Sequence, residues 1–109
     1  MELSIDALDL ENGRVDVVEV RYPKTHMMSI MVAGVGYIMC GLMNIQALDG
    51  LHPEREIIAA RFVGVQKTED LLHFKAAEVT NKARKIGILP GMTGREILNR
   101  MLAFRLSGA

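Results

Sequence analysis

The sequence predicts a single α+β domain in which helices pack on a β-sheet. Residues 1–43 contain two stretches with hairpin character, a later apolar stretch resembles a strand, and the C-terminal half has helical spacing with helix caps. We expect two N-terminal β-hairpins and one further strand to form the sheet, with one short and two longer helices packed on it. A chain of 109 residues fits one domain. Residues 1–23 would form a hairpin arm used for oligomerisation, and residues 24–106 would form the core.

Residues 3–22 predict a hairpin with Asn12-Gly13 at its turn, because both residues accept positive φ angles. A two-residue turn at this position pairs Leu10 with Val15. The apolar face of this hairpin changes sides halfway along both strands. Near the open end it comprises Leu3, Ile5, Ala7, Val18, Val20 and Tyr22, and near the turn it comprises Leu8, Leu10, Val15 and Val17.

Two opposed apolar patches on one hairpin are more than one core can cover. We therefore expect a second copy of the chain to cover the patch near the turn. The expected oligomer interface consists of Leu8, Leu10, Val15 and Val17. The composition agrees with this expectation, because 50% of the residues are apolar and part of that surface would be buried between subunits.

A second hairpin is expected after Pro23, which ends the pairing of the first. Its strands, residues 27–33 and 37–43, are joined by Gly34-Val35-Gly36. Both strands are apolar on both faces, which is typical of central strands that are covered from two sides.

Beyond the second hairpin, Asn44 is suited to cap a short helix over residues 45–51. Residues 57–65 then predict an interior strand. A long helix is expected from Thr68 to about Ile86.

A last helix follows the capping box that begins at Thr93 and ends at Glu96. In this motif the threonine hydroxyl and the glutamate carboxylate each satisfy an exposed backbone N–H. The helix is expected to continue to about residue 106.

Charge and composition narrow the possible partners. Thirteen Lys and Arg residues balance thirteen Asp and Glu residues without a basic cluster, so no nucleic-acid partner is expected. Residues 25–48 carry no charged side chain, but Gly34, Gly36 and Gly41 divide them into strand-sized pieces. We expect buried strands and no membrane partner. A single cysteine forms no internal disulfide, which fits a cytoplasmic protein.

Cys40 is the first candidate for chemistry, with His26, His52 or His73 as a possible base. Nothing in the spacing selects one of these histidines. A cysteine within an apolar strand is more often a small buried hydrophobic residue, and this interpretation is favoured.

An anion pocket is the second candidate, at the start of the last helix. It would use the free N–H groups around Gly91, Thr93 and Gly94 together with the guanidinium of Arg95. The competing interpretation is an ordinary helix cap beside a surface arginine.

Arg61 is the third candidate, because an arginine among apolar strand residues is costly to bury without a partner. A structural ion pair is favoured over a substrate clamp. Its possible partners are Asp49, Glu54, Glu56, Glu69 and Glu78.

No metal site and no cofactor are expected, because one cysteine and three scattered histidines offer no close pair of ligands. Asp9 and Asp16 would face each other across the first hairpin. We interpret them as solvated carboxylates rather than as a cation site.

Several short motifs resemble the YunC-like family of small bacterial and archaeal proteins, a family of unknown function. They are Gly36–Gly41 (GYIMCG), Arg61–Val65 (RFVGV), Thr68–Leu72 (TEDLL), Gly87-Ile88 and Gly91–Glu96 (GMTGRE). The resemblance extends from about Pro23 to Leu102. It implies a cytoplasmic protein whose N-terminal β region is used to form a tetramer, and it implies no activity, substrate or catalytic residue.

The function expected from the sequence is that of a non-enzymatic homo-oligomer, an assembly or small-ligand or protein-binding module. The alternative is an enzyme acting on a small metabolite, through Cys40 and a histidine base or through an anion pocket at Thr93-Gly94-Arg95.

Overall fold

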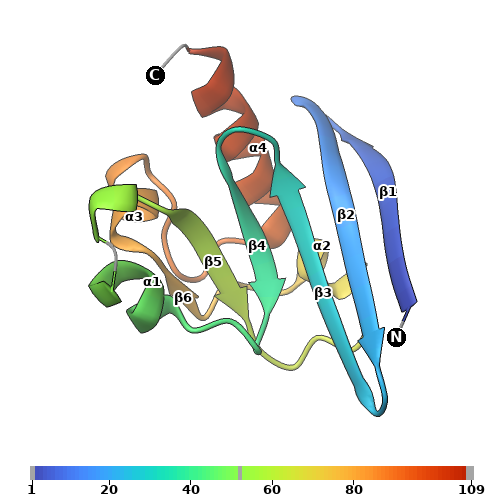
Figure 1. Ribbon diagram of the computed structural model, residues 1–109. Helices are drawn as coiled ribbons and strands as arrows, with labels where there is room; N and C mark the ends of the chain where they lie inside the picture. Colours follow the sequence, from blue (N-terminus) through green and yellow to red (C-terminus); the bar gives the residue numbers. More distant parts are fainter. Residues whose placement is uncertain (1, 52, 108–109) are drawn as a thin grey trace.

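The computed structural model describes residues 2–51 and 53–107 and contains one six-stranded sheet with helices on both of its faces (Figure 1). Its strands are β1 (Glu2–Leu10), β2 (Gly13–Tyr22), β3 (Thr25–Val32), β4 (Gly36–Cys40), β5 (Ile58–Phe62) and β6 (Glu78–Val79). Its helices are α1 (Ile45–Leu51), the 3-10 helix η1 (Pro53–Arg55), α2 (Asp70–His73), α3 (Asn81–Lys85) and α4 (Gly94–Leu106). The α+β class predicted from the sequence is confirmed.

The strands lie in sequential order, and neighbours are antiparallel except β4 and β5. Parallel neighbours need a crossover connection, and α1 lies on the connection between these two strands. The sheet has two strands after the hairpins rather than one. None of the described helices has the length and apolar character needed to cross a membrane.

The turn of the first hairpin differs from the prediction. Leu10 pairs with Gly13, so the turn residues are Glu11 and Asn12, and the register moves by two residues. Only Gly13 has a positive φ here, at 146°. The structure also pairs Asp9 with Arg14, so the expected opposition of Asp9 to Asp16 is wrong. Because side chains alternate with a period of two, this shift leaves the predicted grouping of side chains on the two faces intact.

The expected long helix from Thr68 to Ile86 is also wrong. This segment forms α2, then the short edge strand β6, then α3. Glu78 pairs with Arg61 of β5, and Thr80 accepts a hydrogen bond from the backbone N–H of Ala83 to cap α3. Pairing with a neighbouring strand therefore overrides the helical spacing of the apolar side chains in this segment.

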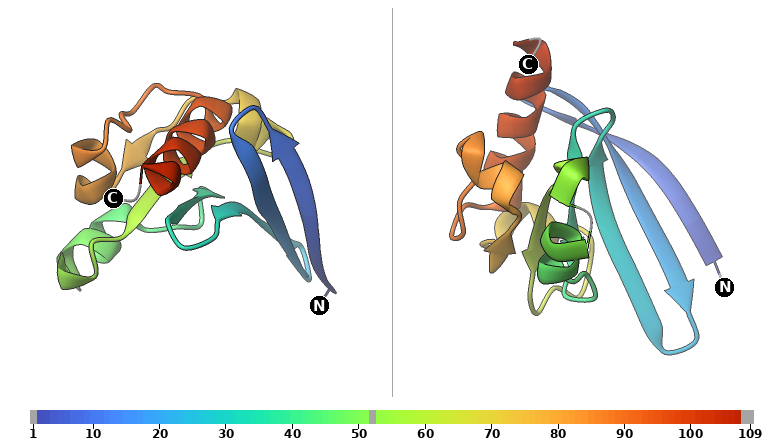
Figure 2. Two further views of the ribbon diagram at one scale, coloured as in Figure 1. Left: turned by 90° about the horizontal axis from the view of Figure 1, so that it is seen from above. Right: turned by 60° about the vertical axis from the view of Figure 1, so that its left-hand side comes forward.

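The two faces of the sheet are covered unequally. Helices α2, α3 and α4 pack on one face, which we call the helical face, and they bury Ile30, Ile38 and Phe62 completely. On the other face, α1 packs Ile45 against Ala59 of β5. Figure 2 shows α1 and α4 on opposite sides of the sheet.

The rest of the second face has no helix over it along β1, β2 and β3 (Figure 2, right). We call this region the open face, and its apolar side chains are Leu3, Ile5, Val18, Val20, Tyr22, Met27 and Met31. Four of them are exposed: Leu3 at 61%, Ile5 at 68%, Tyr22 at 46% and Met31 at 38%. These strands also extend beyond the helices at the end where β2 turns into β3 (Figure 1).

Candidate functional site

The side chains predicted to form the oligomer interface lie on the helical face. Val15 is 1% exposed, and Leu8, Leu10 and Val17 are half-buried against the same core. Leu102 of α4 lies beside Gly13 at the end of this hairpin. The chain's own C-terminal helix therefore covers the patch that was expected to need a second copy, and the prediction of this face as the interface is corrected.

A set of hydrogen bonds fastens the hairpin turn to α4. Glu11 accepts hydrogen bonds from Arg95 Nη1 at 2.7 Å and from Asn99 Nδ2 at 2.6 Å. The backbone N–H of Asn12 donates to Asn99 Oδ1 at 3.1 Å, and its side-chain amide donates to the backbone carbonyl of Asn99 at 3.1 Å. The bond from Asn99, a bond from the backbone N–H of Glu11 and the bond from Arg95 lower the pKa of Glu11 to about 2.

The groups expected to hold an anion are engaged within the chain. Thr93 and Glu96 form the predicted capping box, with N–H to oxygen distances of 2.9 and 3.2 Å. The N–H of Gly94 donates to the carbonyl of Phe74, and the N–H of Gly91 donates to the carbonyl of Ala76. Since Arg95 is paired with Glu11, this helix start is an ordinary cap rather than an anion pocket.

Cys40 is 4% exposed and belongs to the main core. No hydrogen bond among the described residues joins it to a histidine. His26 lies on β3 and His73 ends α2, whereas His52 lies outside the described residues. Cys40 is thus buried in the way expected of the small hydrophobic residue favoured from the sequence. Among the described residues, no hydrogen bond joins its thiol to a histidine that could act as a base.

Arg61 forms an ion pair with Glu78, with 2.9 Å between Nη1 and Oε1, and its Nε donates to the carbonyl of Gly41 at 3.2 Å. The two side chains are opposite each other on β5 and β6. The structural ion pair favoured from the sequence is therefore present, and Glu78 is the partner among the five candidates.

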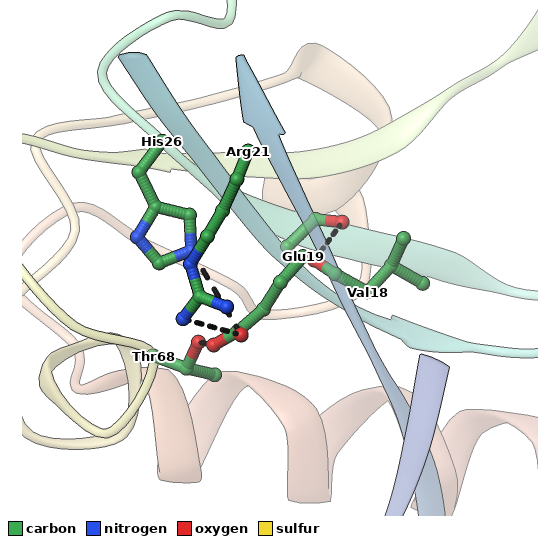
Figure 3. A network of polar contacts seen from close by, with 6 residues as sticks. Val18, Glu19, Arg21, His26 and Thr68 are labelled. Atoms are coloured by element: carbon green, nitrogen blue, oxygen red, sulfur yellow. Dashed lines mark hydrogen bonds and ion pairs between the residues drawn. The ribbon is translucent and has the colours of Figure 1, made fainter. Parts of the chain in front are cut away.

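A polar network that the sequence did not reveal lies on the helical face near the open end of the hairpin (Figure 3). Glu19 of β2 accepts a hydrogen bond from the hydroxyl of Thr68. Its other carboxylate oxygen lies 3.5 Å from Arg21 Nη2 and 3.8 Å from Nε2 of His26. Separately, on the side of the open face, the hydroxyl of Ser29 donates to the carbonyl of Val18, its partner on the neighbouring strand. Glu19 thus connects β2 to the loop that precedes α2.

A cavity of about 280 Å³ lies beside this network, between the first hairpin and α2. Its apolar lining is Leu8, Val17, Ile30 and Leu72, with Ala7 at its edge. Its polar lining is Ser4, Asp6, Glu19, Thr68 and Glu69. Polar residues alternate with apolar ones along β1 and β2, and this alternation was the sequence signal that could have indicated the part of the lining that these strands contribute. The contribution of Thr68 and Glu69 depends on a loop that sequence reasoning placed in a long helix.

Comparison with known proteins gives a consistent family assignment. The family described as "Domain of unknown function (DUF1805)" matches residues 39–101. The uncharacterized protein YunC of Bacillus subtilis (strain 168) is 36% identical over 100 residues, which span 92% of this chain and 98% of YunC. A crystal structure of a protein of unknown function from Thermoplasma acidophilum superposes with a TM-score of 0.78 at 25% identity, over 92% of this chain and 93% of that one.

The chain is therefore a small α+β protein of a family without an assigned activity. It belongs to the DUF1805 family and is a YunC-like protein, as the motifs in the sequence indicated.

Proposed function

We propose that this protein is a non-enzymatic homo-oligomeric module that self-associates through the open face. The observation that carries the proposal is the exposure of Leu3, Ile5, Tyr22 and Met31 on one side of three neighbouring strands. Soluble monomers rarely leave a contiguous apolar surface of this kind in water.

The free edge of β1 supports the same proposal. β1 pairs only with β2 among the described strands, so its outer edge presents unpaired backbone groups over nine residues. Long edge strands beside an apolar face are normally covered, because they otherwise template pairing with other chains. A second copy of the chain would cover the edge and the open face together.

The chemistry of the open face favours a lasting contact between copies. Along β1 and β2 its charged side chains, Asp9, Arg14 and Asp16, lie near the turn, away from the exposed apolar residues. Permanent homo-oligomers have interfaces of this apolar kind. A tetramer is the assembly that the family resemblance implies, and it belongs to this proposal. A cytoplasmic location belongs to it as well, supported by a chain with one cysteine and hence no internal disulfide.

Light scattering coupled to size exclusion tests the proposal. We expect the protein to elute at a multiple of its 12.1 kDa chain mass, at four times that mass for a tetramer. Ile5→Lys, which places a charge among the exposed apolar side chains of the open face, should give smaller species that keep the native circular dichroism spectrum. Leu106→Lys is the matched control, because Leu106 is 76% exposed at the end of α4, on the helical face, and the variant should keep the parental mass.

Two outcomes would overturn the proposal. One is a single-chain mass at every concentration tested. The other is an Ile5→Lys variant that is folded and retains the mass of the parent.

A further inference from the structure

We propose that the cavity between the first hairpin and α2 binds a small organic cation, a primary ammonium group attached to an apolar body. The cavity combines an apolar floor with two carboxylates, those of Asp6 and Glu69, that form no ion pair with the residues the structure describes. Neither the family assignment nor the proposed self-association assigns a ligand to it.

The apolar half of the cavity fits the body of such a ligand. Ile30 is fully buried and Leu72 is 7% exposed, so the floor is part of the packed core. Leu8 and Val17 extend this floor under β1 and β2. A volume of about 280 Å³ is just below the usual range for ligand sites and corresponds to a compact molecule of roughly ten non-hydrogen atoms.

The charge of the cavity comes from two elements. Asp6 is contributed by β1 and Glu69 by the start of α2. Neither carboxylate forms an ion pair with any of the described residues. Asp6 accepts a hydrogen bond from the neighbouring backbone N–H of Ala7 at 2.9 Å, which leaves its negative charge uncompensated. Two such charges, on exposed side chains that line an apolar cavity, attract a cation and repel an anion.

Glu19, the third carboxylate, has a different role. Its charge is offset by Arg21, and it is also held by the Thr68 hydroxyl, with His26 nearby (Figure 3). The contact with Thr68 fastens the loop before α2 to β2 and so positions the neighbouring Glu69, which also lines the cavity. Glu19 is therefore a positioning residue, whereas Asp6 and Glu69 would contact the ammonium group.

The cavity is on the helical face, and the open face is on the other side of the sheet. Ligand binding at the cavity and self-association at the open face therefore use opposite faces of the sheet, and both include the strand β1. The inference does not rest on the proposed self-association, and each can fail without the other.

The test is an NMR titration of the full, isotopically labelled chain with benzylamine, which has an ammonium group on an apolar ring and eight non-hydrogen atoms. We expect shift changes concentrated at residues 4–8 and 68–72, with a dissociation constant of about 1 mM. Benzyl alcohol and benzoate present the same ring with a neutral and an anionic group, and both should bind at least about tenfold more weakly.

Single-residue variants test whether benzylamine binds at this cavity. Asp6→Asn and Glu69→Gln should each weaken benzylamine binding by about tenfold, because each removes one charge-assisted contact. Asp16→Asn is the matched control, since Asp16 lies on β2 but on the open face, and it should bind as the parent does. The backbone spectrum of each variant reports whether it is folded.

Three results would overturn the inference. They are no saturable shift changes up to about 10 mM benzylamine, equal binding of benzyl alcohol, and unchanged affinity in folded Asp6→Asn and Glu69→Gln variants.

Discussion

Glu11, in the turn between β1 and β2, accepts a 2.7 Å hydrogen bond from Arg95 of α4, a residue 84 positions further along the chain. This contact joins the start of the fold to its last helix. Near its turn the first hairpin packs on α4, whereas near its open end Glu19 contacts the loop before α2.

The carboxylate of Glu11 should make the stability of the protein depend on pH in the acid range. Its pKa is about 2 in the folded chain, compared with a reference value of 4.5. A lowered folded pKa means that the carboxylate contributes stability above about pH 4.5 and that this contribution is lost as the pH falls toward 2. Glu11→Gln should therefore be less stable than the parent at pH 7, and the difference should shrink between pH 4.5 and 2.

Urea denaturation at a series of pH values measures this difference in the free energy of unfolding. A gap between the two proteins that stayed constant from pH 7 to pH 2 would show that the Glu11 carboxylate does not carry the effect.

Gly94 should not tolerate a side chain. A Cβ at this position would lie 1.6 Å from the carbonyl oxygen of Leu71, a backbone atom that cannot move without shifting α2. We expect Gly94→Ala to lower the free energy of unfolding by about 3 kcal/mol. Gly50 is the matched control, because a Cβ there meets nothing within 4 Å and the residue is in α1.

Gly50→Ala should leave stability unchanged or raise it by up to about 1 kcal/mol, since alanine is the better helix former. Thermal and urea unfolding of both variants check the pair. Equal stabilities for Gly94→Ala and Gly50→Ala would contradict the packing of Gly94 against α2.

The thiol of Cys40 should be inert in the folded protein. It is 4% exposed within the main core, so a thiol reagent reaches it only when the chain opens. We expect modification by iodoacetamide at the rate of opening under native conditions and rapid modification in urea. Cys40→Ala should remain folded and lose about 1 to 2 kcal/mol of stability, since it removes one buried heavy atom. Rapid alkylation without denaturant would show that the thiol is accessible and would revive a catalytic role.

Local patterns predicted the elements whose causes are local. The helix at residues 45–51 and the capping box of Thr93 and Glu96 occur as expected, because a cap involves atoms three residues apart. The hairpin turn was predicted at Asn12-Gly13 but lies at Glu11-Asn12, where both residues form hydrogen bonds with α4. These bonds join distant parts of the chain, so a local pattern does not predict them. The segment from Thr68 to Ile86 was misread as one helix because pairing of Glu78 with Arg61 is a contact between distant segments.

The candidate site shows the same difference between features with local causes and features that depend on contacts between distant segments. The sequence predicted that Arg61 needs a partner, and the partner proved to be Glu78. The cavity lined by Asp6 and Glu69 was not predicted, because it brings together a strand and a loop more than sixty positions apart.

By itself, the sequence determined the alternation of side chains that groups Leu3 with Ile5 and Leu8 with Leu10 on opposite faces of the hairpin, since backbone geometry sets that period. Only the tertiary structure decided which group is buried, because burial depends on where α4 packs. The packing of α4 depends on contacts between distant residues such as Glu11 and Arg95, and no local pattern encodes them.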